Sequence, residues 1–115
     1  MDDCIFCKVA RGEIPASVVY EDETVLAFDD IHPQAPVHML VITKTHYTGL
    51  ADAVPDVALA ALLAVVPTVA GIKGVAETGY RTIINTGPDA GQSVAHLHLH
   101  LIGGAPMGEG MVRAS

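Results

Sequence analysis

The stretch that decides the fold is His96-Leu97-His98-Leu99-His100-Leu101, in which histidine and leucine alternate. Successive side chains of a β-strand point to opposite faces of its sheet. We therefore expect a strand over residues 94–102 that turns the leucines toward the core and all three histidines toward the other face. A strand that merely faces solvent ordinarily carries Thr, Lys or Glu there, so this row of imidazoles indicates chemistry.

Apolar and turn patterns predict the elements around this strand. A β-branched and aromatic segment and two apolar segments read as strands, and the loop between the second and third contains two prolines. A short helix is expected at the N-terminus, ending before Gly12. The expected strands are 17–20, 24–29, 39–43, 80–85 and 94–102, the short helix is 4–11, and the proline-containing loop is 31–37.

One longer helix is expected over residues 56–77. Its apolar residues repeat at i, i+3, i+4 and i+7, which is typical of a helix with one buried face. Asp56 is a plausible start, Gly79 a plausible stop, and Pro67 should kink the helix because proline lacks an amide donor. The residues of the expected buried stripe are Leu59, Leu62, Leu63, Val66 and Val69.

These elements predict one α+β domain over residues 1–115. Strands outnumber helices and most connections are short, so we expect an antiparallel sheet of about five strands with one main helix and a short N-terminal helix. The sequence has no internal repeat, low-complexity tract or linker.

Composition excludes several classes of protein. Half of the residues are hydrophobic, which rules out a disordered chain. Thirteen acidic residues against six basic ones give a net charge of -7, so binding to nucleic acid or to an anionic membrane is not expected. The apolar segment 57–72 is too short for a membrane span and contains Pro67 and Gly71. Early charges such as Asp2 and Asp3 argue against a secretory signal, so we expect a cytoplasmic protein.

The histidine row allows two kinds of chemistry. Neutral imidazoles can hold a catalytic zinc ion, or one imidazole can be a nucleophile whose neighbours fix its tautomer. The preceding loop, residues 85–93, is rich in glycine and small polar residues. Such a loop lets backbone N–H groups approach an anion closely, which favours attack on phosphorus.

The only two cysteines, Cys4 and Cys7, form a Cys-x-x-Cys motif. A thioredoxin-like redox pair should lie between a strand and a helix, yet only three residues precede this motif. A zinc site is the alternative, and it would need two further ligands, which the six histidines could supply.

The chain resembles the histidine triad (HIT) family over residues 4–104. The signature of that family, His-x-His-x-His followed by apolar residues, is similar to the run Gly91-Gln92-Ser93-Val94-Ala95-His96-Leu97-His98-Leu99-His100-Leu101-Ile102. The N-terminal half resembles the Hint-like branch, in its bacterial type with an N-terminal Cys-x-x-Cys. The matching segments are Ile5-Phe6, Gly12-Glu13-Ile14-Pro15-Ala16, Phe28-Asp29-Asp30-Ile31, Pro33-Gln34-Ala35-Pro36 and His38.

This resemblance implies a role for each histidine of the active site. His98, the middle histidine, would be the nucleophile that attacks the α-phosphorus and forms a nucleotidyl-imidazole. His100 would donate hydrogen bonds to phosphate oxygens or to the leaving group. His96 would orient the strand and the nucleophile, and His38 would hydrogen-bond into the triad.

The resemblance also implies a nucleotide site. Ser93 and the Gly91 backbone fall where the family binds phosphate oxygens and assists the leaving amine, and Gln92 belongs to the same loop. Asn85 falls at another phosphate position, and Asp30 matches the acid that accepts hydrogen bonds from the ribose hydroxyls. The apolar slot for the base would consist of Ile5, Phe6, Val9, Phe28 and Ile31.

Some bacterial members bind structural zinc, and their pattern implies the ligand set Cys4, Cys7, His46 and His96. Zinc on one ring nitrogen of His96 would lock that residue beside the nucleophile. No cofactor would then be required for the chemistry itself. His32 matches no functional position of the family and is interpreted as surface.

The function implied by the resemblance is hydrolysis of purine nucleoside phosphoramidates through a covalent nucleotidyl-histidine. Three alternatives stay open: a dinucleoside polyphosphate hydrolase, a zinc hydrolase with metal on all three triad histidines, and a non-enzymatic nucleotide-binding regulator. A homodimer is expected, because a small sheet has exposed edges and family members pair through the main helix and the sheet edge. The chain has no Trp, and its tail 107–115 differs from the Hint pattern, which leaves substrate preference open.

Overall fold

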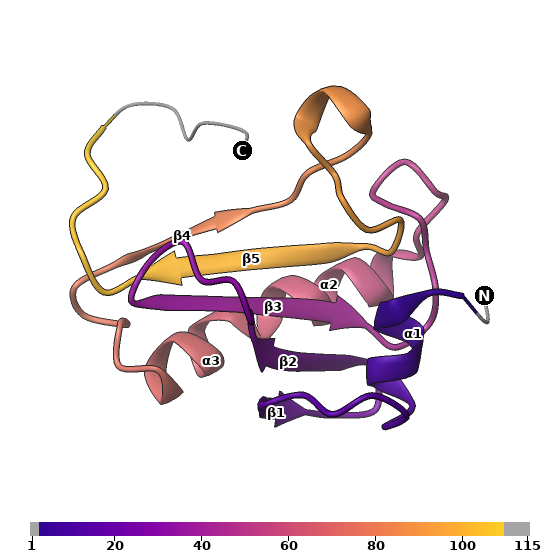
Figure 1. The fold of residues 1–115 in the computed structure, drawn as a ribbon, viewed down its shortest axis with the longest axis horizontal. Helices are drawn as coiled ribbons and strands as arrows, with labels where there is room; N and C mark the ends of the chain where they lie inside the picture. The colour runs from indigo at the N-terminus through magenta and orange to yellow at the C-terminus, as the bar shows by residue number, and fades with distance from the viewer. Residues whose placement is uncertain (1–2, 110–115) are drawn as a thin grey trace.

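Strand β5 (His98–Gly103) lies inside a five-stranded antiparallel sheet, hydrogen-bonded to β3 on one side and to β4 on the other (Figure 1). The computed structural model describes residues 3–109; the predicted domain ends and the end of the tail, residues 1–2 and 110–115, lie outside them. The sheet has the order β1-β2-β3-β5-β4. The other strands are β1 (Val18–Glu21), β2 (Val25–Asp29), β3 (Val37–Thr43) and β4 (Tyr80–Ile83).

Pairing of β5 with β3 gives the sheet two different faces. Leu99 lies opposite Val41 and Leu101 lies opposite Met39, and these residues are buried on the face covered by helices. On the other face His98 lies opposite Ile42 and His100 opposite Leu40. The predicted α+β class, with a five-stranded antiparallel sheet, is confirmed.

The expected helix over 56–77 is divided into two. Helix α2 (Asp56–Ala64) and helix α3 (Val66–Ile72) meet at Val65, two residues before the predicted kink. Pro67 explains the position of the break. In a continuous helix its ring would clash with the carbonyl group four residues earlier, whereas proline is tolerated in the first turn of a helix. The predicted stop at Gly79 was too late: α3 ends at Ile72, and Gly74 then adopts a left-handed φ of 76°.

Only part of the predicted apolar stripe is buried. Leu62, Val66 and Val69 belong to the core under the sheet, whereas Leu63 is 54% exposed and Leu59 is half-buried. Ala58 and Ala70 complete the buried surface of the two helices. The buried positions keep the helical spacing through Val65, and this stripe leaves Leu63 on the solvent side of α2.

Helix α1 (Ile5–Ala10) packs on the opposite face of the sheet from α2 and α3 (Figure 1). Phe6 and Val9 of this helix form a second apolar cluster with Phe28, Leu40 and Ile42. In this way the N-terminal segment is brought against the end of the sheet at which β5 begins.

The strand at the histidine row is shorter than predicted. β5 begins at His98, four residues after the expected start, so His96 lies in a bend before the strand, although its ring contacts Phe6 as the ring of His98 does. The backbone N–H of Leu97 donates to the Tyr47 carbonyl at 2.7 Å and draws the chain out of the sheet ladder at this point. No helix within residues 3–109 is long and apolar enough to cross a membrane.

Candidate active site and metal centre

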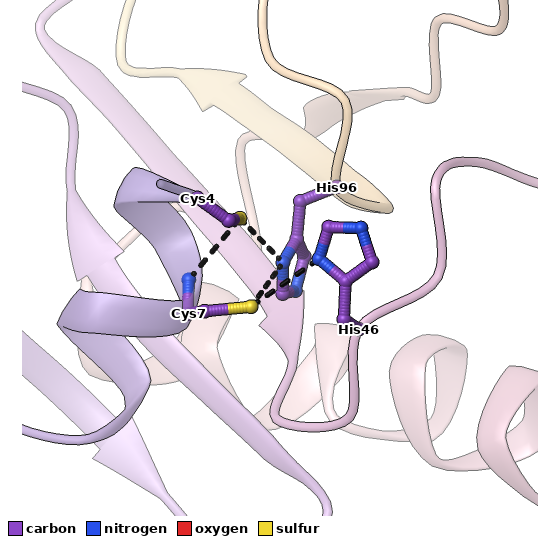
Figure 2. Close-up of side chains that lie close together, drawn as sticks. All are labelled: Cys4, Cys7, His46 and His96. Carbon is purple, nitrogen blue, oxygen red and sulfur yellow. Dashed lines mark hydrogen bonds between the residues drawn. The ribbon is translucent and has the colours of Figure 1, made fainter. Parts of the chain in front are cut away.

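His96 is fully buried and both of its ring nitrogens are engaged; Figure 2 shows its contacts with Cys4 and Cys7. Its Nε2 lies 2.6 Å from the Thr43 carbonyl oxygen, which can only accept, so Nε2 carries the proton. Nδ1 therefore has a free lone pair, which faces Cys4 Sγ at 3.2 Å and Cys7 Sγ at 3.5 Å. Burial lowers the pKa of His96, so the ring is neutral.

Four potential metal ligands converge at this point. Cys4 caps α1, where its Sγ accepts the Cys7 N–H at 3.4 Å, and Cys7 lies one turn further along. His46 approaches from the segment after β3, with its Nδ1 3.2 Å from Cys7 Sγ. The ligand atoms of Cys4, Cys7, His46 and His96 all lie within 4.8 Å of one another.

This donor set fits zinc. Zn–S and Zn–N bonds of tetrahedral sites imply sulfur–nitrogen separations of about 3.6 Å, close to the distances found. A metal binds a ring nitrogen that carries no proton, and the tautomer of His96 with an unprotonated Nδ1 meets this requirement. Burial, and the neighbouring Cys4, raise the pKa of the Cys7 thiol, so a bound cation would be what stabilises its thiolate here. The set is closed, which is typical of a structural rather than a catalytic zinc.

His98 is buried on the face of the sheet opposite α2 and α3, and one of its ring nitrogens is free. Its Nδ1 lies 2.6 Å from the His96 carbonyl oxygen and must donate a proton to it, which leaves a lone pair on Nε2. The edge-on ring of Phe6 lies against it, with centroids 5.1 Å apart. Burial is the main reason that the pKa of His98 is lowered, although the nearby Asp30 carboxylate acts in the opposite direction. The side chain is therefore a neutral imidazole suited to nucleophilic attack.

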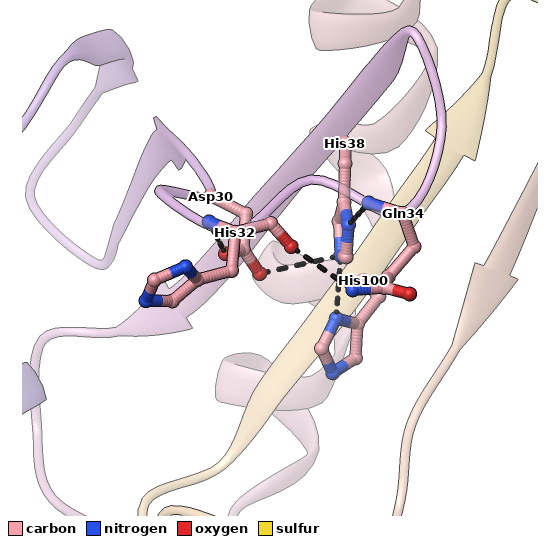
Figure 3. Close-up of polar contacts among 5 residues, drawn as sticks. All are labelled: Asp30, His32, Gln34, His38 and His100. Carbon is pink, nitrogen blue, oxygen red and sulfur yellow. Dashed lines mark hydrogen bonds and ion pairs between the residues drawn. The ribbon is translucent and has the colours of Figure 1, made fainter. Parts of the chain in front are cut away.

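A chain of hydrogen bonds fixes the tautomer of His100 (Figure 3). The Gln34 backbone N–H donates to His38 Nδ1 at 2.9 Å, so His38 carries its proton on Nε2. That nitrogen lies 3.0 Å from His100 Nδ1, which accepts, and 3.3 Å from Asp30 Oδ2. His100 consequently carries its proton on Nε2, where it can be donated to a ligand. Burial, with His98 and His38 nearby, lowers the pKa of His100 to about 4.

Asp30, His38 and His100 also lie within 4.8 Å of one another and could hold a metal by distance alone. The tautomer of His38 argues against it. A metal on Nε2 would need the proton on Nδ1, yet Nδ1 already accepts the Gln34 N–H. This cluster fits a hydrogen-bonding relay rather than a metal.

The loop before the triad is shaped by Gln92. Its Oε1 accepts the Gly87 N–H at 2.9 Å, while its Nε2 donates to the carbonyls of Thr48 at 2.7 Å and Val94 at 3.0 Å. Gly91 has a left-handed φ of 79°, which closes the short 3-10 helix η1 (Pro88–Ala90). The side chain of Gln92, predicted to bind nucleotide, thus supports the loop. Ser93 is exposed and Asn85 half-buried.

The residues predicted to form the base slot divide into two groups. Phe6, Val9 and Phe28 are buried in one cluster beside the triad, and the rings of Phe6 and Phe28 meet edge to face. Ile5 is 49% exposed and Ile31 is 86% exposed, so neither belongs to that cluster.

Three backbone groups of the site were not predicted from the sequence. They are the Gln34 N–H, the Thr43 carbonyl and the His96 carbonyl, each bonded to an imidazole nitrogen. Every residue has a backbone carbonyl and every residue except proline a backbone N–H, so residue type gives no signal of these groups. His32, interpreted as surface, is exposed, and its backbone N–H donates to Asp30 Oδ1 at 2.8 Å.

Comparison with known proteins identifies the family. The HIT domain model matches residues 11–107. The chain belongs to the HIT domain family. It is 44% identical to the purine nucleoside phosphoramidase of Escherichia coli, over 93% of this chain and 92% of that protein. It is 52% identical to a 14 kDa zinc-binding protein of Zea mays, over 90% and 83% of the two chains. The HIT family hydrolase structure from Legionella pneumophila has a TM-score of 0.87 and 48% identity, covering 92% and 96%.

The lowered pKa of His100 predicts a dependence of stability on pH. Between the ordinary pKa near 6.5 and about 4, the unfolded chain binds a proton at this position that the folded chain does not. The free energy of unfolding should therefore decrease as the pH falls through this window, by up to about 1.4 kcal/mol per pH unit. Urea unfolding from pH 7 to 4 should show a smaller slope for His100→Asn than for the wild type. Equal slopes would contradict the prediction.

The Cys/His cluster predicts one tightly held zinc ion per chain. Elemental analysis after dialysis should find zinc in the wild type and lose it in Cys4→Ser/Cys7→Ser, because serine does not supply a thiolate. Substitution with cobalt should produce thiolate charge-transfer absorption only where the cysteines are present. His32→Asn is the control, since His32 lies outside the cluster. Zinc retained equally by the double variant would rule out this ligand set.

Proposed function

We propose that this protein hydrolyses purine nucleoside 5′-phosphoramidates, with His98 as a covalent nucleophile. The observation that carries the proposal is the hydrogen bond from His98 Nδ1–H to the His96 carbonyl, because it leaves the Nε2 lone pair free for attack. The printed name of the Escherichia coli relative, purine nucleoside phosphoramidase, supports the choice of substrate class.

In the first step the Nε2 lone pair of His98 attacks the α-phosphorus, and the bond from phosphorus to the leaving nitrogen breaks. The imidazole bonded to phosphorus becomes cationic, and the His96 carbonyl oxygen on Nδ1–H stabilises that charge. The Nε2–H of His100 is placed to donate a hydrogen bond to a phosphate oxygen or to the leaving group, with Ser93 assisting the departing amine. The leaving nitrogen takes up a proton from solvent as this bond breaks, and the water of the second step later returns one to solvent.

In the second step water attacks the same phosphorus, and the bond to His98 Nε2 breaks. The product is a nucleoside monophosphate, the water loses a proton, and the imidazole returns to its neutral form. Dividing one difficult displacement into two is the advantage of covalent catalysis. A zinc ion held by Cys4, Cys7, His46 and His96 would supply rigidity and no chemistry at phosphorus.

The nucleotide would lie across the face that carries His98 and His100. Asp30 would accept hydrogen bonds from the ribose hydroxyls through its ionised carboxylate, which is acceptor-only. Backbone N–H groups of the loop 85–93, including Gly91, would meet the phosphate together with Asn85. Phe6, Val9 and Phe28 would contact the base, with Ile5 and Ile31 at the exposed margin.

The three triad histidines are poorly arranged for a shared catalytic metal. His96 Nδ1 faces the cysteines, whereas His98 Nδ1 bonds to a carbonyl and His100 Nδ1 faces His38. Parallel assays with an adenosine phosphoramidate and a diadenosine polyphosphate would rank the two remaining hydrolase activities. AMP binding without turnover of either substrate would favour a regulator instead.

A homodimer is part of the proposal. Strand β4 is at the edge of the sheet, and the exposed side of α2 carries Val57 and Leu63, which are 78% and 54% exposed. Pairing of two copies would extend the sheet and cover these side chains. Wild-type protein should sediment as a dimer at micromolar concentration, and Leu63→Glu should shift it toward monomer because a charge would be buried. A monomeric wild type would contradict this assembly.

Replacement of the nucleophile provides the central prediction. His98→Asn should abolish turnover of an adenosine phosphoramidate and leave AMP binding largely intact, because an amide nitrogen has no lone pair available for attack. His100→Asn should cost less, about 10²–10⁴-fold, as is typical of a positioned acid–base group. His32→Asn is the matched control and should keep wild-type turnover.

Rapid quenching of the wild type with labelled substrate should trap the label on His98, in an acid-labile and base-stable phosphorus–nitrogen bond. Wild-type turnover by a well-folded His98→Asn protein would exclude the covalent mechanism.

A further inference from the structure

The carbonyl that orients His98 belongs to a residue outside the sheet. His96 lies in a bend before β5, where its own N–H donates to the Val94 carbonyl at 2.9 Å. The next residue, Leu97, donates to Tyr47 rather than to a neighbouring strand. The His96 carbonyl lies in the same planar peptide as the Leu97 N–H, so the bond to the Tyr47 carbonyl helps to fix it, and Tyr47 directly follows the cluster residue His46.

The imidazole of His96 is a further anchor of this residue. One ring nitrogen bonds to the Thr43 carbonyl at the end of β3, and the other faces the thiols of Cys4 and Cys7. The ring also meets His46 edge to face, with centroids 4.9 Å apart. Loss of the Cys/His cluster would leave the ring with a single polar anchor, about which it could turn.

Helix α1 provides a second connection to the nucleophile. Phe6 lies between Cys4 and Cys7 in the sequence, and its ring contacts both His96 and His98 edge-on, with centroids 5.9 and 5.1 Å apart. Whatever holds the two thiols in place also holds this ring against the nucleophile.

We propose that Cys4, Cys7 and His46 are positioning residues for the reaction at His98. Held together by a metal ion, they fix His96, and the His96 carbonyl then keeps His98 in the tautomer protonated on Nδ1. Without them His98 also populates the tautomer protonated on Nε2, which has no Nε2 lone pair for attack. The kinetic consequence rests on the proposed function, whereas the tautomer consequence does not.

The fraction of His98 in the Nδ1–H form sets the size of the expected effect. Only the Nδ1–H form of His98 can attack, so kcat should fall by the same factor as the fraction of this form. Binding of AMP, which does not require the Nε2 lone pair, should change far less. We therefore expect kcat to fall at nearly constant KM, in proportion to the fraction of the Nδ1–H form of His98 measured by spectroscopy on the free protein.

The experiment compares wild-type zinc protein, the chelated protein, and Cys4→Ser/Cys7→Ser. Proton–nitrogen correlation spectra of labelled histidine give the tautomer of His98, with its resonances assigned by their loss in His98→Asn. We expect one tautomer with zinc, a mixture without it, and recovery when zinc is returned to the chelated wild type but not to the double variant. The control is Val69→Ala, a core substitution on the far face of the sheet that should reduce stability without changing the tautomer.

Each outcome decides the inference. An unchanged His98 tautomer after removal of zinc would overturn it, as would an equal change in Val69→Ala. If the chelated protein and the double variant unfold, His46→Gln, which keeps three ligands, is measured with and without excess zinc, and the same two criteria apply. If the tautomer shifts as expected but no phosphoramidate is hydrolysed even by the wild type, the proposed function fails and the positioning role stands.

Discussion

The hydrogen bond from His98 Nδ1 to the His96 carbonyl, 2.6 Å long, is the interaction on which the arrangement of this site depends. A neutral imidazole has one donor and one acceptor nitrogen, so the choice of partner for one nitrogen decides the chemistry of the other. The same principle applies to His96 and His38, which are fixed by the Thr43 carbonyl and the Gln34 N–H. Four imidazoles are thus oriented by three backbone groups, and His100 takes its tautomer from His38.

Apolar burial on the core side of β5 offsets the cost of burying these imidazoles. Burial of imidazoles lowers the pKa of His96, His98 and His100 and keeps them neutral, but removing polar rings from water is unfavourable. Leu97, Leu99 and Leu101 are at most 1% exposed on the other side of the same segment, and burying a leucine side chain contributes roughly 1.5–3 kcal/mol. Alternation along one short segment therefore joins a stabilising face to a functional face, and the strand cannot shift by one residue without exchanging them.

The sequence predicted the five-stranded sheet and the short N-terminal helix well, because alternation and turn residues are local signals. Boundaries were less predictable where tertiary contacts decide them: β5 begins at His98 because Leu97 bonds to Tyr47, a residue fifty positions away. Pro67 was expected to kink one helix and instead separates two, with the break at Val65. Within the site, the sequence brought attention to Gln92 but could not assign its contact with the Thr48 carbonyl, because that residue is 44 positions away in the chain.

Distance alone does not separate the two histidine clusters of this protein. Both the Cys4/Cys7/His46/His96 set and the Asp30/His38/His100 set bring their ligand atoms within 4.8 Å of one another. The difference lies in the ring nitrogen that faces away from each cluster. His96 donates from this nitrogen to the Thr43 carbonyl, whereas His38 accepts at it from the Gln34 N–H. In the first cluster the lone pair points inward and suits a cation; in the second the proton points inward and suits a relay to His100. Because His96 belongs to the first cluster and its carbonyl orients His98 beside the second, a single residue connects the part of the molecule that suits a metal with the part that suits proton donation.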